Sequence, residues 1–195
     1  MKKFLPLLLI IGILVLAGFY MMNLNNRLVK LDESASAQWA NVESSYQRRA
    51  DLIPNIVNTA KGYAEFEQET LIKVTEARSK ATSITIDPSN ITPEQLQQFQ
   101  QAQSGLTSAL SRLLAVFERY PDLKANENFK ELINELERTE NRINVERNRF
   151  NDEARVFNTE IKQFPATLFA GILGFDAKAY FEAEAGNENA PVVEF

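Results

Sequence analysis

The sequence predicts an all-α membrane protein, with an N-terminal transmembrane helix followed by an up-and-down four-helix bundle. Three observations support this fold class: an uncharged apolar run near the N-terminus, apolar residues at three- and four-residue spacing along most of the remaining chain, and only 7 glycines in 195 residues. Three long helices, the first kinked at Pro54, are the alternative arrangement.

The apolar run begins at Phe4 and ends at Met22. About 20 apolar residues with a rise of about 1.5 Å each can cross a hydrocarbon core of about 30 Å, so we expect residues 1–23 to anchor the chain in a lipid bilayer. A cleaved secretory signal, with Val15-Leu16-Ala17 before the cleavage point, is the alternative interpretation.

Positive charges on the two sides of the run predict its orientation. Lys2, Lys3 and the terminal amine precede it, whereas Arg27 and Lys30 follow it. Because cytoplasmic flanks carry the excess of positive charge, this pattern favours a cytoplasmic N-terminus. We therefore expect a single-pass protein of the cell membrane with an extracytoplasmic bundle.

Composition limits the chemistry of the body. The chain has 21 basic and 26 acidic residues and no basic patch interleaved with aromatic side chains, so nucleic acid is not an expected partner. It contains no His and no Cys, which removes the usual nitrogen and sulfur ligands of metals and the common nucleophile–base pairs. Glu137 and Glu140 could share a cation. Two glutamates at this spacing more often form ion pairs with arginines, here Arg138 or Arg142. We expect no catalytic residues, metal or cofactor.

The first two apolar stripes lie on either side of a proline. One stripe runs from Leu28 to Arg49 and the next from Ile53 to Ala81. A proline inside a helix costs about 3 kcal/mol, so Pro54 predicts a turn or a kink near residues 50–54.

Helix-start signals place the other two helices. Thr92-Pro93-Glu94-Gln95 reads as a capping box that opens a helix ending before Tyr120-Pro121, and Asn126 opens a last helix that Pro165 ends. We assign residues 24–175 to the bundle, with 164–175 packed under it or lying at the lipid surface. Residues 176–195 are expected to be a tail, partly disordered over its last ten residues.

Polar residues near the two predicted distal turns form a candidate docking surface. If both turns lie farthest from the membrane, polar and aromatic groups from both would converge on one rigid tip. The candidates are Arg48, Arg49, Asp51, Asn55, Tyr120, Asp122 and Lys124. The alternative interpretation is a buried polar network that satisfies the backbone groups freed around Pro54.

A second polar group is expected to be structural, and its members are Asn58, Glu140, Asn141 and Arg142. Glu140 lies at the inward edge of the last stripe and would need a partner such as Gln38 or Arg147. Trp39 and Tyr63 are expected to be core residues whose polar atoms are hydrogen-bonded.

Several long motifs resemble those of the bacterial LemA family. They are residues 46–55 (YQRRADLIPN), 123–129 (LKANENF) and 139–143 (TENRI), with Phe164-Pro165 and Gly174-Phe175. The resemblance covers almost the whole chain and implies a single-pass membrane protein with a short N-terminal anchor and a helical body. The resemblance supplies no catalytic residues. Members of the family are discussed mainly as membrane-associated factors in stress or signalling.

Together these observations favour a non-enzymatic, membrane-anchored interaction or scaffold protein in envelope stress or signalling. Its partner would be an unidentified membrane or envelope protein. The alternative is a structural membrane protein that self-associates as a homo-oligomer.

Overall fold

The computed structural model describes residues 5–63 and 67–182, and these form helices, turns and extended segments without a strand among them. The long helices are α1 (Leu5–Lys61), α2 (Gln68–Thr82), α3 (Pro93–Phe117) and α5 (Glu127–Lys162). A short helix, α4 (Pro121–Ala125), precedes α5, and a 3-10 turn, η1 (Ala166–Leu168), follows it. The predicted all-α class is confirmed.

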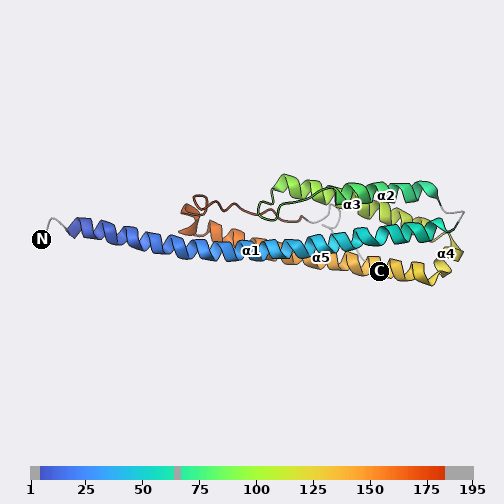
Figure 1. Ribbon diagram of the computed structural model, residues 1–195, viewed down its shortest axis with the longest axis horizontal. Helices are drawn as coiled ribbons and strands as arrows, with labels where there is room; N and C mark the ends of the chain where they lie inside the picture. Colours follow the sequence, from blue (N-terminus) through green and yellow to red (C-terminus); the bar gives the residue numbers. More distant parts are fainter. Residues whose placement is uncertain (1–4, 64–66, 183–195) are drawn as a thin grey trace, which may run out of the picture.

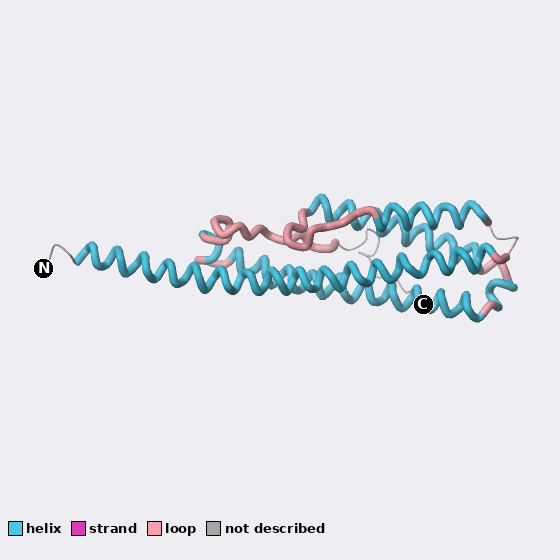
Figure 2. Tube along the Cα trace, in the orientation of Figure 1, coloured by secondary structure: helices cyan, strands magenta, loops and turns pink. Residues whose placement is uncertain are grey.

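The helices run up and down along one long axis. Figure 1 shows α1 and α5 side by side, whereas α2 and α3 cover the part of the body away from the N-terminus, with α3 reaching closer to the N-terminal end than α2 does. The tube in Figure 2 shows that successive long helices are antiparallel. In the distal half, apolar residues of α1, α2, α3 and α5 share one core, which includes Ile56, Val74, Leu113 and Phe129. The distal half is therefore an up-and-down four-helix bundle.

The predicted turn at residues 50–54 is wrong, because α1 continues through Pro54 to Lys61. The second apolar stripe is divided between two helices: Ile53 belongs to α1, and Leu71 and Ala81 belong to α2. Asp51 lies inside α1, where its carboxylate accepts a 2.8 Å hydrogen bond from Gln47.

Arg78 of α2 supplies the donor that Pro54 lacks. In a regular helix the amide of residue 54 would donate to the carbonyl of Ala50, but proline has no N–H. Ala50 is buried, and its carbonyl accepts a 2.7 Å hydrogen bond from Nε of Arg78. Pro54 itself is exposed. The helix continues because this hydrogen bond comes from a neighbouring helix.

The two predicted helix starts are confirmed. The amide of Gln95 donates to Oγ1 of Thr92 at 3.3 Å, and Oε1 of Gln95 accepts from the amide of Thr92 at 3.2 Å, which completes the capping box. Oδ1 of Asn126 accepts from the amide of Phe129 at 2.9 Å. These caps set where α3 and α5 begin.

A second core, rich in aromatic rings, lies nearer the N-terminal end. Trp39 contacts the rings of Phe99, Phe150 and Phe181, with centroids 5.3 to 5.7 Å apart. The indole N–H of Trp39 has no hydrogen-bond partner, so the expectation that it would be paired is wrong. The hydroxyl of Tyr63 does accept a 2.9 Å hydrogen bond from Asn126, as expected.

Residues 176–182, the first part of the segment assigned as a tail, pack on the bundle. The Asn158 amide group donates to the Lys178 carbonyl and accepts from the Lys178 amide, both at 2.8 Å. Asn151 forms the same pair of hydrogen bonds with the backbone of Phe181, at 2.9 and 2.8 Å. These two side chains act as a strand edge would, because each offers one donor and one acceptor. The predicted disorder of the last ten residues lies outside the described residues.

We predict that Arg78→Met destabilises the protein by about 1–3 kcal/mol, because it leaves the buried Ala50 carbonyl without a donor. In a Pro54→Ala background, residue 54 regains its N–H, so the same Arg78→Met change should cost clearly less. The four proteins form a double-mutant cycle that chemical denaturation in detergent can measure. Equal costs in both backgrounds would show that Arg78 does not replace the missing donor.

Candidate functional site

A buried arginine lies between the helices of the bundle. Arg49 of α1 is only 1% exposed, and its guanidinium lies 5.1 Å from the ring centre of Tyr46. Its Nη1 donates to the Glu140 carboxylate at 2.7 Å and to the Thr107 hydroxyl at 3.0 Å. Its Nη2 donates to Oε1 of Gln103 at 2.6 Å. Because a buried charge is costly unless it is paired, these contacts are what make Arg49 tolerable there.

The same group connects all four long helices. Arg49 comes from α1, Gln103 and Thr107 from α3, and Glu140 from α5, and we call these four residues the polar layer. Nε2 of Gln103 donates at 3.2 Å to the carbonyl of Ala81, which lies at the end of α2. The polar layer therefore fixes the helices in one register.

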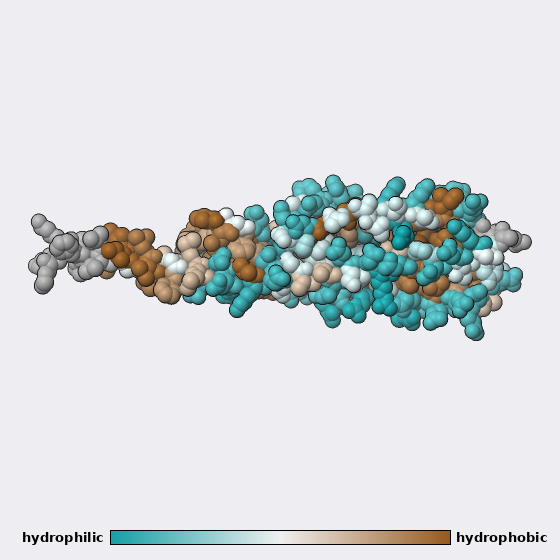
Figure 3. All heavy atoms as spheres, in the orientation of Figure 1, coloured by the Kyte–Doolittle hydropathy of each residue, from teal (hydrophilic) through white to brown (hydrophobic). Residues whose placement is uncertain are grey.

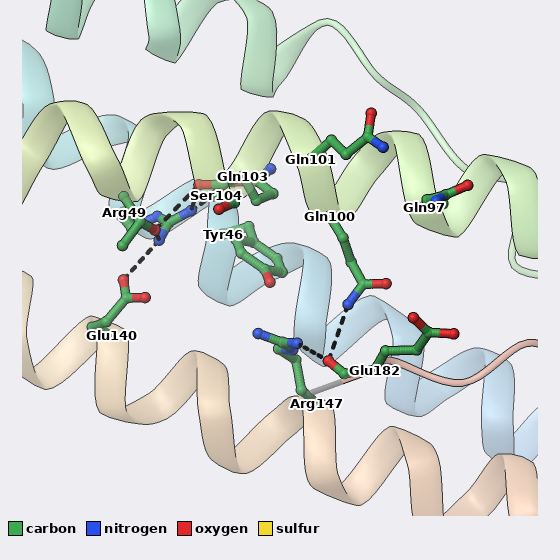
Figure 4. Close-up of a pocket in the computed structure, with 11 residues that line it drawn as sticks. Tyr46, Arg49, Gln97, Gln100, Gln101, Gln103, Ser104, Glu140, Arg147 and Glu182 are labelled. Atoms are coloured by element: carbon green, nitrogen blue, oxygen red, sulfur yellow. Dashed lines mark hydrogen bonds and ion pairs between the residues drawn. The ribbon is translucent and has the colours of Figure 1, made fainter. Parts of the chain in front are cut away.

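A cavity of about 460 Å³ lies beside the polar layer. Figure 4 shows Arg49 and Glu140 paired at one end, and Arg147 and Gln100 directed toward Glu182 at the other. Arg147 donates to the Glu182 carbonyl at 3.0 Å and Gln100 donates to it at 3.3 Å. Nε of Arg49 is buried and has no hydrogen-bond partner. The strong donors of this cavity are thus largely satisfied by the protein itself.

A second cavity of about 460 Å³ opens between α1 and α5. We call it the arginine groove, and its lining residues are Asn41, Ser44, Ser45, Arg48, Glu135, Arg138, Thr139 and Arg142. Glu135 binds two of these arginines: its carboxylate lies 2.6 Å from Arg48 and 2.8 Å from Arg138.

About three turns farther along α5, Glu146 pairs in the same way with two more arginines. Its side chain is 2% exposed and lies 3.2 Å from both Arg142 and Arg149. Gln38 of α1 donates to the same carboxylate at 2.8 Å. The ion pairs around Glu135 and Glu146 therefore hold two carboxylates against four guanidinium groups, and this part of the seam carries an excess of positive charge although the whole chain has a net charge of −5.

Hydrogen bonds hold both carboxylates in the ionised form. The hydrogen bond from Gln38 lowers the pKa of Glu146 below its ordinary value of 4.5, with Arg149 and Arg142 contributing and burial opposing the shift. Hydrogen bonds from Arg138 and Arg48 lower the pKa of Glu135 in the same way. The seam between α1 and α5 is therefore an ion-pair ladder at neutral pH.

The residues predicted for the distal docking surface do not share one surface. Arg49 is buried in the polar layer, and Arg48 lines the arginine groove. Asp51 and Asn55 are exposed on α1, because the helix continues where a turn was expected. At the distal end, the remaining candidates occupy different environments: Tyr120 packs against the distal core, Asp122 is exposed in α4, and Lys124 pairs with Glu118.

The predicted structural group is only partly assembled. Glu140 is bound by Arg49 rather than by Gln38 or Arg147, since Gln38 is used by Glu146. Arg142 also pairs with Glu146, whereas Asn58 and Asn141 are exposed.

Sequence reasoning missed Glu146 and Gln103. Both lie on buried stripes: Glu146 falls three residues after Ile143, and Gln103 three residues before Leu106. A polar residue at a position where the helical period requires an apolar one was the available signal.

The structure defines a class of protein: a helical bundle whose first helix continues into an apolar N-terminal segment. Among the described residues, this is the one helix long and apolar enough to cross a membrane, and its apolar part is almost entirely exposed. Residues 38–195 match the LemA family, so the chain belongs to that family, as its motifs indicated.

Curated relatives agree with this assignment. The chain is 26% identical to magnetosome protein MamQ 1 of Paramagnetospirillum magneticum, over 95% of this chain and 75% of the relative. It is 28% identical to magnetosome protein MamQ of Magnetospirillum gryphiswaldense, over 93% and 74%. It is also 28% identical to protein LemA of Metamycoplasma hominis, over 73% of this chain and 61% of that protein. These similarities support a membrane-associated helical protein.

We predict that Glu140→Gln destabilises the protein by about 2–3 kcal/mol, because it leaves the buried Arg49 charge without a counter-ion. The effect should lie at the low end for buried pairs, since the Glu140 side chain is 38% exposed. The double change Arg49→Met with Glu140→Leu should recover most of the loss. Denaturation midpoints provide the measurement, and a double variant less stable than Glu140→Gln would contradict the role of unpaired charge.

We predict that the stability difference between the protein and its Glu146→Gln variant shrinks at acid pH. The folded-state pKa of Glu146 is lowered, so its carboxylate stabilises the fold above 4.5, and this contribution is lost as pH falls through the lower folded value. Urea denaturation at pH 7 and pH 3 would measure it. Removing the main donor with Gln38→Leu should make the pH dependence of that difference weaker, and an unchanged dependence would contradict the assignment.

Proposed function

We propose that the protein is a membrane-tethered, non-enzymatic interaction module whose arginine groove binds an acidic segment of another membrane or envelope protein. The observation that supports this most directly is the arrangement of Arg48, Arg138 and Arg142, whose side chains are 70%, 64% and 69% exposed around one cavity. Each guanidinium has five N–H donors, so those used on Glu135 or Glu146 leave others free for a second carboxylate.

The groove is also preorganised for binding. It lies between the two longest helices, and the ion pairs with Glu135 and Glu146 hold its arginines before any partner arrives. Its lining includes the small polar side chains of Ser44 and Ser45, which leave room for a bound chain. Preorganised charge raises association rate and specificity, because less ordering is needed on binding.

The acidic pairs considered as a possible catalytic or cation site are better explained as structure. Glu140 is bound by Arg49, so it is not available to share a cation with Glu137.

Self-association is the second candidate function. Val145 and Val156 of α5 are each about half exposed (47% and 49%), and they recur at three helical turns on one face. Such a face could pack against a second copy. The relatives named magnetosome proteins are compatible with either role, because a scaffold on a membrane can act by binding partners or by assembling with itself.

A single cysteine at Ser44 would test the proposal, because the chain has no native cysteine. A membrane-impermeant maleimide should label it in intact cells if the bundle is extracytoplasmic, as the flanking charges predict. The same cysteine, carrying a benzophenone crosslinker, should capture a distinct acidic membrane or envelope protein. A cysteine at the exposed Ser79 of α2 is the control for random collisions.

Charge removal separates the alternatives. The double change Arg48→Gln with Arg142→Gln should reduce the captured product at least tenfold. Arg155→Gln is the control, because Arg155 lies on α5 like Arg142, is 70% exposed and is outside the groove, so this change should leave the yield unaltered. A product of twice the chain's own mass would favour self-association. Equal capture from Ser44 and Ser79 would exclude the groove as the binding surface.

A further inference from the structure

The chain after α5 forms a compact apolar turn over residues 164–175. Its backbone is hydrogen-bonded like a helical coil, with the amides of Phe169 and Ala170 both donating to the carbonyl of Ala166 at 2.9 Å. Phe164, Leu168 and Ile172 recur every four residues and are 79%, 58% and 76% exposed. The apolar turn therefore carries three large hydrophobic side chains on its outer side.

The inner side of the apolar turn packs on the first helix of the bundle. Ala166 and Ala170 are buried in a cluster with Leu24 and Leu28 of α1, and the ring of Phe169 lies 6.0 Å from the ring of Tyr20. Tyr20 belongs to the apolar run that we assign to the bilayer, near the end where tyrosines mark the membrane interface. This contact places the apolar turn at the level where the first helix leaves the lipid.

The apolar turn is held in this conformation at its far end. Gly174 has φ of +81°, and the amide of Phe175 donates to the carbonyl of Ala170 at 3.0 Å. The ring of Phe175 then packs edge-on against Phe157 of α5, with centroids 6.1 Å apart. The exposed side chains thus project from a fixed base.

The exposed apolar surface lies beside the anchor, because the inner side of the apolar turn packs on α1 at Tyr20 and Leu24. Phe19 and Met22 of α1 are also more than half exposed. Figure 3 shows hydrophobic atoms along the N-terminal helix and again over the adjoining end of the body, whereas hydrophilic atoms predominate farther along. Around the apolar turn, Lys162 is exposed and Arg27 pairs with Glu160, which are suitable groups for a headgroup layer.

We propose that the apolar turn inserts into the acyl–headgroup boundary of the bilayer as a second lipid contact, with Phe164, Leu168 and Ile172 in the lipid. The occupant is lipid rather than a second chain, because the apolar turn packs on α1 at Tyr20, the interfacial end of the segment that we assign to the bilayer. The segment is too short to span a bilayer but fits the interfacial depth of about 5–10 Å. Two contact points, α1 and the apolar turn, would then fix the tilt of the bundle relative to the membrane. This inference does not depend on the arginine groove.

The test uses the full chain in nanodiscs that hold one protein each. Nitroxide labels are attached to single cysteines at Leu168 and Ile172, and their accessibility to molecular oxygen and to a water-soluble nickel chelate is measured. Lipid insertion predicts that oxygen, which concentrates in the bilayer, relaxes these labels more than the chelate does. A label at Ser44 on the exposed surface of the body should show the reverse order. The helical content of each cysteine variant, measured before the label is attached, is the folding control.

Two results would overturn the proposal. Chelate accessibility at Leu168 and Ile172 equal to that at Ser44 would place the apolar turn in water. Discs that hold two or more copies provide the second comparison. In these discs, protection from both reagents together with spin–spin broadening would show that a second copy covers the apolar turn. A label at the neighbouring exposed Thr167 tests the direction of insertion, since it should reach the chelate more readily than Leu168 does.

Discussion

The whole body depends on α1 continuing unbroken from the apolar run to the distal end of the bundle. The weak point of that helix is Pro54, where the Ala50 carbonyl loses its usual donor. Arg78 replaces the donor from α2, so the helix is completed by tertiary structure rather than by its own backbone. This hydrogen bond also connects α1 to α2 close to the polar layer, and it therefore couples the continuity of the first helix to the packing of the second.

The polar layer adds specificity to a core that hydrophobic packing alone would leave free to slide. A buried ion pair gains little net free energy, because desolvation offsets its attraction. Its geometry is nevertheless demanding: Arg49 reaches Glu140 and Gln103 together only in one relative register of α1, α3 and α5. The paired hydrogen bonds of Asn151 and Asn158 fix the position of residues 176–182 in the same way. Sequence positions that look like defects in the apolar stripes are thus the positions that define the arrangement.

Local signals in the sequence predicted the fold well. The features that they did not predict depend on contacts between residues distant in the sequence. The capping box at Thr92 and the cap at Asn126 involve groups three residues apart, so the sequence contains all the information needed. Whether the helix continues through Pro54 depends on Arg78, and no residue near position 54 indicates that contact. The error then affected the candidate site, because one of the two turns assigned to the docking surface, the one near Pro54, lies inside α1. The extended path of residues 176–182 has no period that would reveal it, and contacts distant in the sequence hold it, among them the paired hydrogen bonds of Asn151 and Asn158 and the packing of Phe181 on Trp39.

The distribution of polarity along the long axis suggests how the parts work together. The anchor-proximal end is apolar on its outer side at Leu168 and Ile172, whereas the seam between α1 and α5 is lined by arginines held against Glu135 and Glu146. Because α1 and α5 are packed along the full length of the body, the arginine groove keeps a constant distance from the lipid-facing end. A partner with an acidic segment at a matching height above the same membrane would meet the groove without a search in three dimensions, so the tether raises its effective concentration. A modest affinity at the groove would then suffice for a stable complex.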